Sequence, residues 1–395
     1  MRTAVVGGGA AGFFLAINLK EMVPQMAVTI FEKSQKVLAK VEVSGGGRCN
    51  CTNTFAAVND LSKVYPRGHR LMKRLFNVFN QHDACQWFER RGVRLVTQAD
   101  QCVFPASQDS HTIINCLTSE ARRLGIEVLT GSKVTSLQQL QDYDFVAVTT
   151  GGSPRAEGLS WLTERGIETV APVPSLFSIS IDDKRLQSLM GTVDESAILF
   201  IPSTKLRATG PLLITHWGIS GPATLRLSSY AARELHAANY KLPLAINWVS
   251  SSDTDIAREL YSIAAEHPQK LIQSIGLSPL SSRLWAYLTE KALGRQRALG
   301  RWKSLNMKEM YRLTNILCND TYHTAGRTAF KEEFVTCGGV SLKAVNPNTL
   351  ESRVIPRLFF AGEVLDIDGV TGGFNFQAAW TTAYTVALAI AAKSG

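Results

Sequence analysis

The sequence contains little of what marks several other classes of protein. Its 395 residues include only seven scattered cysteines, which argues against a disulfide framework and favours a reducing compartment, the cytoplasm. No apolar run approaches the roughly 20 residues that span a bilayer; the longest is Val386 to Ala392. Hydrophobic residues make up 45% of the chain and charged residues 19%, values that exclude intrinsic disorder. We therefore expect a globular cytoplasmic protein without a membrane partner, built of two or three domains.

Patterns of metal ligands are also scarce. Cys49 and Cys51 have one residue between them and no second pair, so they predict buried thiols rather than a zinc site or a redox disulfide. The segment that starts Asp366-Ile-Asp368-Gly369 resembles the beginning of a calcium loop, but its twelfth position is Gln377 instead of glutamate. We expect no bound metal.

A glycine-rich segment near the N-terminus is the most informative feature that is present. Gly7-x-Gly9-x-x-Gly12 follows a short apolar run, Thr3 to Val6, and opens a stretch of helical composition, Ala10 to Met22. In this pattern the first glycine permits a tight turn, the second lets the backbone approach a pyrophosphate, and the third allows close packing of helix on strand. The helix N-terminus then offers free N–H groups to phosphate oxygens.

An acidic residue completes this pattern. Glu32 lies 20 residues after Gly12, at the end of a second strand-like run, Val28 to Phe31. A carboxylate at that place can accept hydrogen bonds from ribose hydroxyls. The segment therefore predicts a site for an adenosine ribose without a 2′-phosphate.

The remaining elements predict an α/β protein with a Rossmann-like, discontinuous nucleotide-binding domain. Tyr143 to Thr149 and Arg357 to Ala361 have the composition of buried strands, and Asn375 to Ala392 that of a long apolar helix. Between them, short β-rich runs from about 172 to 250 predict an inserted antiparallel β domain, either a small sheet or a barrel. The segment from about 254 to 320 is helical in pattern. We expect the nucleotide-binding domain at 1–171 and 338–395, the β domain at 172–252 and 322–337, and the helical insert at 253–321.

Three further segments carry polar or glycine-rich patterns. Ser44 to Asn50 contains three consecutive glycines followed by an arginine, which suggests a backbone that approaches a flat or charged group, although a surface loop remains an alternative. Gly372 and Gly373 open the last helix, whose N–H groups could face a ligand that gains negative charge. His216 lies in a polar loop and is a candidate acid or base, although a structural role is also open.

Charge is unevenly distributed. The net charge is +9, and residues 291–312 contain seven basic side chains against one acid, Glu309. Such a stretch can meet phosphate or nucleic acid. Because no aromatic-interleaved RNA module accompanies it, we favour a solvated helical surface and expect no nucleic-acid partner.

These motifs, in this order, resemble the YhiN-like flavoproteins, also called the aminoacetone-oxidase family. The matching stretches are Val5 to Gly12, Ser44 to Asn50, Val103 to Pro105, Thr150 to Gly152, Thr215 to Pro222, Thr336 to Leu342 and Phe360 to Trp380. The resemblance implies FAD, bound without a covalent link, in a discontinuous Rossmann-like domain with a β domain and a helical insert. It implies that the glycine turn lines the pyrophosphate, that Glu32 meets the adenosine ribose, and that the start of the last helix faces the pyrimidine edge of the flavin.

The expected site residues follow from the motifs and the resemblance together. Arg48, Asn50 and His216 are the candidate catalytic residues. The expected cofactor-binding residues are Gly7, Gly9, Ala10, Ala11, Gly12, Glu32, Lys33, Lys40, Ser44, Gly45, Gly46, Gly47, Arg48, Cys49, Asn50, Val134, Thr150, Gly151, Gly152, Gly362, Glu363, Asp366, Gly372, Gly373, Phe374 and Asn375.

We expect a flavin-dependent oxidoreductase that transfers a hydride between flavin N5 and a small organic substrate. Amine oxidation with O2 and enone-type reduction both stay open. The basic stretch motivates an alternative, an FAD-containing flavoprotein that modifies or binds RNA, and a third possibility is a redox sensor without turnover. No second Gly-x-Gly-x-x-Gly follows a strand, so we expect no separate pyridine-nucleotide domain, while NAD(P)H could dock transiently. The sequence leaves the oligomeric state open.

Overall fold

The computed structural model describes residues 1–153, 156–327 and 335–395 and divides the chain into two compact units. Unit 1 consists of Met1–Pro174 and Val335–Gly395, and unit 2 runs from Ser175 to Phe334. Part of the expected return segment 322–337 lies outside the described residues.

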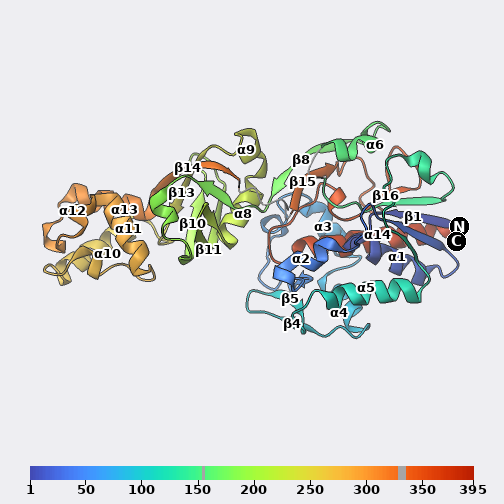
Figure 1. Ribbon diagram of the computed structural model, residues 1–395, viewed down its shortest axis with the longest axis horizontal. Coiled ribbons are helices and arrows are strands. Elements are labelled where there is room, and N and C mark those ends of the chain that lie inside the picture. Colours follow the sequence, from blue (N-terminus) through green and yellow to red (C-terminus); the bar gives the residue numbers. More distant parts are fainter. Residues whose placement is uncertain (154–155, 328–334) are drawn as a thin grey trace. The chain divides into compact units, whose positions relative to one another are not determined.

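Unit 1 is built on a five-stranded parallel sheet. The strand order is β16-β7-β1-β2-β6, and each neighbouring pair is parallel. The strands are β1 (Arg2–Val6), β2 (Ala27–Phe31), β6 (Glu127–Leu129), β7 (Phe145–Val148) and β16 (Leu358–Phe360). Because β16 comes from the far end of the chain and pairs with β7, the sheet confirms the expected Rossmann-like arrangement that the C-terminal segment completes (Figure 1).

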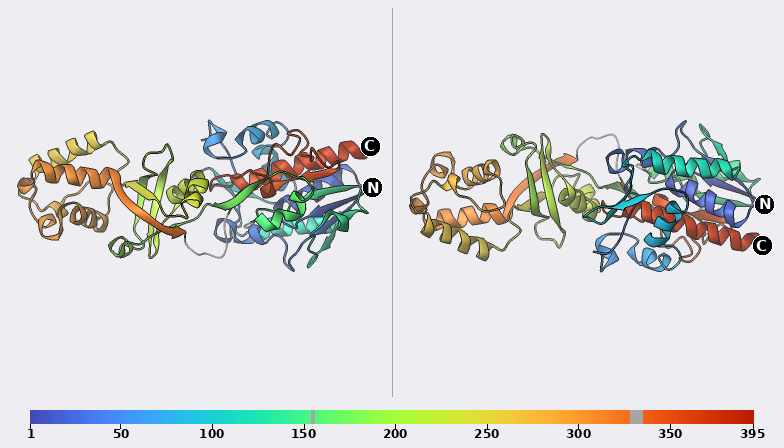
Figure 2. Two further views of the ribbon diagram at one scale, coloured as in Figure 1. Left: turned by 90° about the horizontal axis from the view of Figure 1, so that it is seen from above. Right: turned by 90° about the horizontal axis from the view of Figure 1, so that it is seen from below.

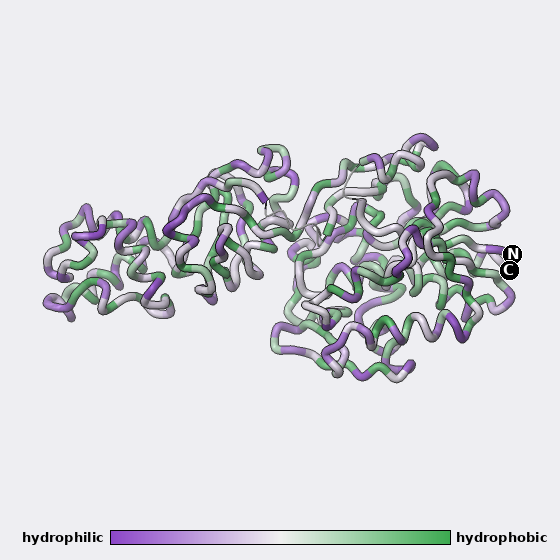
Figure 3. The backbone as a smooth tube through the Cα atoms, in the orientation of Figure 1, coloured by the Kyte–Doolittle hydropathy of each residue, from purple (hydrophilic) through white to green (hydrophobic). Residues whose placement is uncertain are grey.

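Two apolar helices form the centre of unit 1. Helix α1 (Ala10–Met22) begins directly after the glycine turn, and α14 (Phe374–Ser394) is the last element of the chain. They pack against each other, with the rings of Phe14 and Trp380 5.1 Å apart. Trp380 is fully buried and donates a hydrogen bond from its indole nitrogen to the Cys51 carbonyl (2.8 Å). Figure 3 shows hydrophobic segments concentrated in this interior and hydrophilic ones in the outer loops.

Smaller elements surround this core. A three-stranded antiparallel sheet has the order β3-β5-β4, and β8 pairs with β15. The remaining elements of unit 1 are α2 (Ala39–Gly47), β3 (Thr52–Asn53), η1 (Leu61–Lys63), α3 (His69–Leu75), α4 (Gln81–Glu89), β4 (Leu95–Thr97), β5 (Cys102–Pro105), α5 (His111–Arg123), η2 (Leu137–Leu140), η3 (Ala156–Leu159), α6 (Ser160–Thr163), β8 (Thr169–Ser175), β15 (Val335–Val340) and η6 (Gly362–Val364).

Unit 2 contains a closed antiparallel barrel with the strand order β10-β11-β12-β9-β14-β13. This confirms the expected inserted antiparallel β domain, and of the two expected forms it has the barrel. Its strands are β9 (Ile179–Ile181), β10 (Val193–Phe200), β11 (Arg207–Thr215), β12 (Gly218–Ser220), β13 (Pro243–Asn247) and β14 (Asp320–Arg327), with the helices α7 (Lys184–Gln187), α8 (Pro222–Tyr230) and α9 (Ala232–Ala237).

A helical insert separates β13 from β14 in the chain (Figure 2). It contains α10 (Asp253–Glu266), η4 (Ile272–Ser274), α11 (Ser282–Leu293), α12 (Arg295–Ala298), η5 (Trp302–Ser304) and α13 (Met307–Asn319). Helix α10 ends before His267-Pro268, as the sequence predicts, since proline lacks the N–H that would continue the helix. The helices share one hydrophobic core with the barrel, in which the Trp285 and Trp302 rings stack 6.3 Å apart.

A buried polar network joins the insert to the barrel. Asp320 at the start of β14 is fully buried and accepts hydrogen bonds from Tyr322 (2.6 Å) and from the Trp248 indole (3.1 Å). Its other carboxylate oxygen lies 2.5 Å from the Lys291 ammonium group of α11. Tyr322 in turn shares a hydrogen bond with Tyr287 of α11 (2.9 Å). Burial raises the pKa of Asp320, and Lys291 opposes that rise.

Among the residues that the structure describes, no helix has both the length and the apolar character needed to cross a membrane.

Candidate functional site

The glycine turn after β1 has two crowded positions and one open one. A Cβ atom on Gly7 would lie 2.4 Å from the Thr149 carbonyl oxygen, and Gly7 has a φ of +120°. A Cβ on Gly12 would lie 2.0 Å from the Gly7 carbonyl oxygen. Around Gly9, by contrast, no atom lies within 4 Å of such a Cβ. The first and third glycines are therefore needed for packing, and the second leaves space for a group that approaches the backbone.

Helix α1 begins at this open position, and its N-terminus has no side-chain cap. Gly9 is its N-cap, no side chain caps it, and its first turn carries no acidic residue. The early N–H groups of the helix, including those of Ala10 and Ala11, can therefore donate to an anion, where the helix dipole adds about half a positive charge.

Glu32 lies beside the turn, at the end of β2. One of its carboxylate oxygens accepts a hydrogen bond from the Gly8 N–H (2.9 Å), and the other accepts from the Ser34 N–H and hydroxyl (both 2.8 Å). Lys33 next to it is exposed, and the half-buried Val134 packs on the cluster of Ala4, Val6 and Leu140. Glu32 and Val134 thus occupy the rim of the sheet where an adenosine would lie over the turn.

The run of glycines after Val43 breaks α2. Ser44, Gly45 and Gly46 have non-helical backbone angles, and Gly45, Gly46 and Gly47 all have positive φ. A Cβ on Gly46 or Gly47 would meet no atom within 4 Å. The segment therefore presents open backbone rather than a packed helix, as the sequence suggests.

Arg48 follows this open backbone and stays close to it. Its guanidinium group lies 4.5 Å from the centre of the Phe104 ring, and its Nε donates to the Gly45 carbonyl (3.0 Å). One terminal nitrogen also reaches Gln108 (3.4 Å). Ring and carbonyl hold Arg48 in place, while its remaining N–H groups can donate to a ligand.

Asn50 connects the glycine run to the start of α14. With its amide oriented so that both ends find partners, the nitrogen donates to the Thr52 carbonyl (2.9 Å) and the oxygen accepts from the Gly373 N–H (3.2 Å). Gly373 is the N-cap of α14, has a φ of +86°, and no side chain caps the helix. Helix α14 therefore leaves its next N–H groups available, as α1 does.

The side chains at the start of α14 face inward. The Asn375 amide exchanges two hydrogen bonds with the Gly369 backbone (2.8 and 2.9 Å). Phe374 is buried beside Phe55 and Tyr65, and its carbonyl accepts a hydrogen bond from the Tyr65 hydroxyl (2.8 Å). What Phe374 and Asn375 can offer a ligand is thus their backbone, whereas their side chains fix the loop in front of the helix.

The residues after β7 and β16 meet near the glycine turn. A Cβ on Gly362 would lie 2.8 Å from the Ala11 Cβ, and Glu363 accepts a hydrogen bond from the Thr336 N–H (2.8 Å) and pairs with Lys40 (2.8 Å). Gly152 lies against the Glu363 carboxylate. The segments expected to share one cofactor therefore converge within unit 1.

The other expected residues of these two segments flank that junction. The Thr150 Cα lies beside Gly7, and Gly151 has a φ of +74°. Asp366 is half-buried, and its N–H donates to the Val340 carbonyl (2.9 Å). Gly372 accepts a hydrogen bond from the Asn53 amide at its carbonyl (3.0 Å).

An ion pair that the sequence analysis missed holds the loop before α14. Arg67 contacts the fully buried carboxylate of Asp368 with two of its nitrogens, and the two residues also form an isolated β-bridge. They are 301 residues apart, so no local pattern pairs them. The two acidic residues of Asp366-Ile-Asp368 were a signal that this loop carries structural or functional contacts, but they do not identify Arg67 as the partner of Asp368.

The cysteines of the glycine run are buried thiols, as expected. Burial raises the pKa of Cys49 to about 12 and holds that of Cys51 well above its ordinary value. A thiol with such a pKa is a poor nucleophile at neutral pH. Cys49 can therefore contribute shape and backbone to the site, not thiolate chemistry.

His216 belongs to unit 2 and is exposed. Its ring lies 4.1 Å from that of Trp217, in the loop between β11 and β12. The other expected site residues all lie in unit 1.

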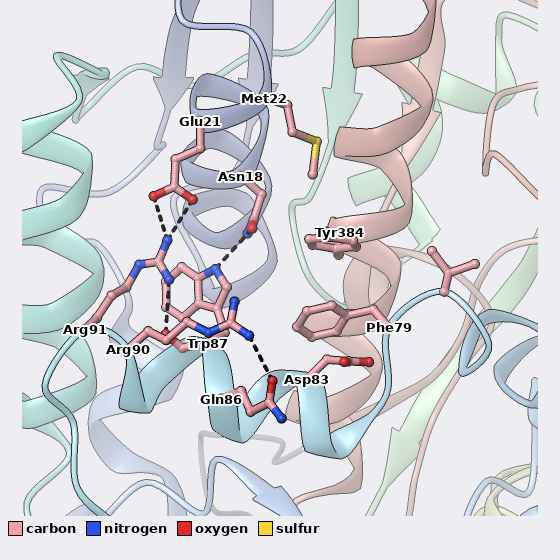
Figure 4. A pocket seen from close by; sticks show the side chains of 11 residues that line it. Asn18, Glu21, Met22, Phe79, Asp83, Gln86, Trp87, Arg90, Arg91 and Tyr384 are labelled. Carbon is pink, nitrogen blue, oxygen red and sulfur yellow. Dashed lines mark hydrogen bonds and ion pairs between the residues drawn. The ribbon is translucent and has the colours of Figure 1, made fainter.

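A separate pocket of about 430 Å³ lies at the other end of α1 (Figure 4). Asn18, Glu21 and Met22 line it from α1, opposite Phe79 and residues of α4. Its charged groups already pair within the protein, since Arg91 binds Glu21 (2.7 Å) and lies 3.7 Å from the centre of the Trp87 ring. It contains none of the expected site residues.

The arrangement in unit 1 fits FAD. The open space at Gly9 and the uncapped N-terminus of α1 suit a pyrophosphate, and the carboxylate at the end of β2 suits a ribose. The exposed glycine backbone after Ser44 and the uncapped start of α14 suit a flat, polar ring edge.

Comparison with known proteins gives the family. Residues 1–389 match the HI0933-like protein Rossmann domain family. The chain is 26% identical over 415 residues to a protein of Haemophilus influenzae named ribosomal RNA dihydrouridine synthase, covering 98% of this chain and 97% of that one. It is 25% identical over 415 residues to a 3-dehydro-bile acid delta(4,6)-reductase of Clostridium scindens, covering 99% of each chain.

Among solved structures, 3-ketosteroid delta1-dehydrogenase from Sterolibacterium denitrificans aligns over 99% of both chains with 11% identity and a TM-score of 0.47, a similarity too low to compare sites. The match over nearly the whole length is decisive: the chain belongs to the HI0933-like family of FAD-binding oxidoreductases with a Rossmann domain.

Proposed function

We propose that this protein reduces a carbon–carbon double bond conjugated with a carbonyl group. FAD, when bound, supplies the hydride. The names of two relatives support this reaction class, because both describe one kind of bond. Formation of dihydrouridine saturates a ring double bond that is conjugated with a carbonyl of uracil. A 3-dehydro bile acid with double bonds at 4 and 6 likewise has them conjugated with its 3-keto group.

The observation that carries the proposal is that α1 and α14 both start without a side-chain cap on the glycine segments of unit 1. Gly9 opens α1 and Gly373 opens α14, and at neither does a side chain satisfy the helix N–H groups. One start suits the phosphates of the cofactor. The other can stabilise negative charge that develops during the reaction, because fixed N–H groups need no reorganisation when the charge appears.

Two side chains of unit 1 are candidates for a role at the substrate. Arg48, held by Phe104 and the Gly45 carbonyl, would donate hydrogen bonds to the substrate carbonyl. Asn50 would keep Gly373 in position through its hydrogen bond to that N–H. Saturating the bond also needs a proton on the neighbouring carbon. His216 lies in unit 2, and its catalytic role stays a prediction from the sequence alone.

The test is reoxidation of the reduced protein by candidate substrates. The purified protein is photoreduced without oxygen and then mixed with a small conjugated ketone, with its saturated counterpart, or with O2 alone, while the visible flavin absorbance is followed. The proposal predicts rapid return of that absorbance with the conjugated ketone only. Rapid reoxidation by O2, together with bleaching of the oxidised protein by amines, would instead establish amine oxidation.

Uridine in RNA is a second candidate for the carrier of this double bond. It is favoured by the cluster of basic residues in 291–312 and by the relative named ribosomal RNA dihydrouridine synthase. This candidate runs against the expectation, drawn from the sequence alone, that nucleic acid is not a partner. Synthetic RNA replaces the ketone in the same experiment, and NAD(P)H replaces light as the source of electrons, which tests the transient docking of that cofactor.

A further inference from the structure

The exposed face of α13 differs from an ordinary solvated helix face. Its buried side consists of Glu309, Met310, Leu313, Thr314, Leu317 and Cys318. On its other side Lys308, Tyr311, Arg312 and Asn315 follow one another at the i, i+3, i+4 and i+7 spacing that places them on one face. We call these four residues the α13 stripe. It combines two cations, an aromatic ring and an amide, and contains no acid.

The tyrosine of the stripe is unusually open. The Tyr311 side chain is 73% exposed, although large aromatic residues ordinarily bury most of their surface. It lies between Lys308 and Arg312, neither of which is within ion-pair distance of a carboxylate in the described part of the chain. An exposed ring between two cations that form no ion pair is the combination that single-stranded nucleic acids need, since the phosphates meet the cations and a base stacks on the ring.

The single acid of this region does not cancel the positive charge. Glu309 points into the bundle, where both of its carboxylate oxygens pair with Arg297 of α12 (2.6 and 2.8 Å). This pairing lowers the pKa of Glu309 to about 2. Arg297 is half-buried and engaged in this pair, and the exposed cations of the segment before α13 are Arg295, Arg301 and Lys303.

Another helix of the same insert provides an internal contrast. Helix α10 carries a cation and a tyrosine three positions apart, Arg258 and Tyr261, and Tyr261 is 50% exposed. There, however, Arg258 pairs with Asp255 (3.1 Å), and Glu259 and Glu266 are exposed on the same helix. The exposed charge of α10 is thus mainly negative and that of α13 is positive, and ordinary solubility does not require this difference in sign.

We propose that the α13 stripe is a docking surface for single-stranded RNA, with Lys308 and Arg312 on phosphates and Tyr311 stacked on an unpaired base. The inference rests on the proposed function, for which it would supply the macromolecular substrate. An anionic membrane fits less well, because the apolar side of α13 is buried in the bundle and cannot insert. An acidic protein would use the cations but leaves the exposed ring without a role.

The test measures binding of a fluorescent oligouridylate of about 12 nucleotides by anisotropy at several salt concentrations. Each phosphate contact to a single strand contributes about 0.7 to the slope of log affinity against log salt concentration. The double variant Lys308→Ala/Arg312→Ala should therefore lower the slope by about 1.4. The matched control, Arg258→Ala on α10, should leave affinity and slope unchanged.

The ring is tested separately. Tyr311→Ala should weaken binding roughly fivefold to a hundredfold with an unchanged salt slope, and Tyr311→Phe should restore it, because stacking needs only the ring. The matched control is Tyr261→Ala. Thermal unfolding of each variant confirms that the insert is intact.

The proposal is overturned if the wild-type protein does not bind the oligonucleotide, if the α10 controls weaken binding as much as the stripe variants, or if polyglutamate or anionic vesicles compete as well as RNA does. Reduction of a small conjugated ketone is measured on the same variants and should be unchanged. Stripe-dependent RNA binding by a protein that reduces no conjugated bond would refute the proposed function and leave the docking surface standing.

Discussion

The helices of unit 1 that begin at glycine and the helices of the insert start in different ways. In the insert, Ser252, Ser281 and Asn306 cap α10, α11 and α13 by accepting a hydrogen bond from a backbone N–H of the first turn. Helices α1 and α14 start at Gly9 and Gly373, where no side chain plays this role. Helices α10, α11 and α13 thus satisfy a first-turn N–H group of their own, whereas α1 and α14 leave theirs to a ligand.

Not every helix of unit 1 lacks a cap. Helix α4, which belongs to unit 1 but contains none of the expected site residues, carries a capping box in which Asn80 and Asp83 each bind the other's backbone N–H. Uncapped starts also occur elsewhere, for example at Gly68 before α3. What distinguishes Gly9 is that its start is uncapped and the space beside its backbone is open as well. The predictions below alter one side of this contrast at a time.

The largest effect is expected from Gly12→Ala. The new methyl group would meet the Gly7 carbonyl oxygen at 2.0 Å, and backbone cannot move away as a flexible side chain can. We expect a loss of at least about 3 kcal/mol in the free energy of unfolding of unit 1, with loss of bound flavin. Chemical denaturation followed by tryptophan fluorescence measures it, and a variant as stable as the wild type would show that this contact is not tight.

A similar but smaller loss is expected on the other side of the contrast, from Lys291→Met. This change leaves the buried Asp320 carboxylate without its cation, and uncompensated buried charge costs about 3 kcal/mol. Because the pair lies in unit 2, the flavin content of the purified protein should not change. A variant that keeps its stability but loses flavin would reverse this assignment.

The third prediction concerns pH. Asp194 in β10 is buried, and burial raises its pKa from 3.8 to about 6. The native state therefore holds this proton more tightly than the unfolded state, so stability falls as pH rises through about 6. Asp194→Asn should raise the free energy of unfolding by about 1–2 kcal/mol at neutral pH and have little effect near pH 4. Thermal unfolding at both pH values decides this, and an equal gain at both would contradict it.

The smallest effect is expected from removing a cap. Ser281→Ala deprives the Leu284 N–H of its partner (3.3 Å) and should cost about 1 kcal/mol of stability. The melting temperatures of this variant and of the wild type measure the effect, and an unchanged melting temperature would contradict it.

Local sequence patterns predicted the parts of the fold that depend on local physics. The helix expected at Ala10 to Met22 has those bounds, and the strands before and after it lie within a residue of the expected runs. Alternating strands and helices allow few topologies, so the parallel sheet could be expected as well. For the inserted β domain the sequence left a sheet and a barrel open, because closure depends on β9 pairing with both β12 and β14, far apart in the chain.

The glycines of the candidate site could be predicted from the sequence, but the contacts that hold the site together could not. Gly7, Gly9 and Gly12 form a spaced pattern with a known physical reason. The hydrogen bond between Asn50 and Gly373, the ion pair of Arg67 with Asp368, and the pair of Lys40 with Glu363 each join residues about 300 positions apart, and single-sequence reasoning contains no term for them.

The central claim is that FAD lies on the open backbone at Gly9, and Gly9→Ala tests it most directly. The apoprotein should keep its melting temperature, because no atom lies within 4 Å of the added methyl group and the φ of −94° suits alanine. Titration with FAD, followed by quenching of its fluorescence, should show affinity at least about tenfold weaker, a change of about 1.4 kcal/mol. Unchanged affinity for FAD in this variant would contradict the account.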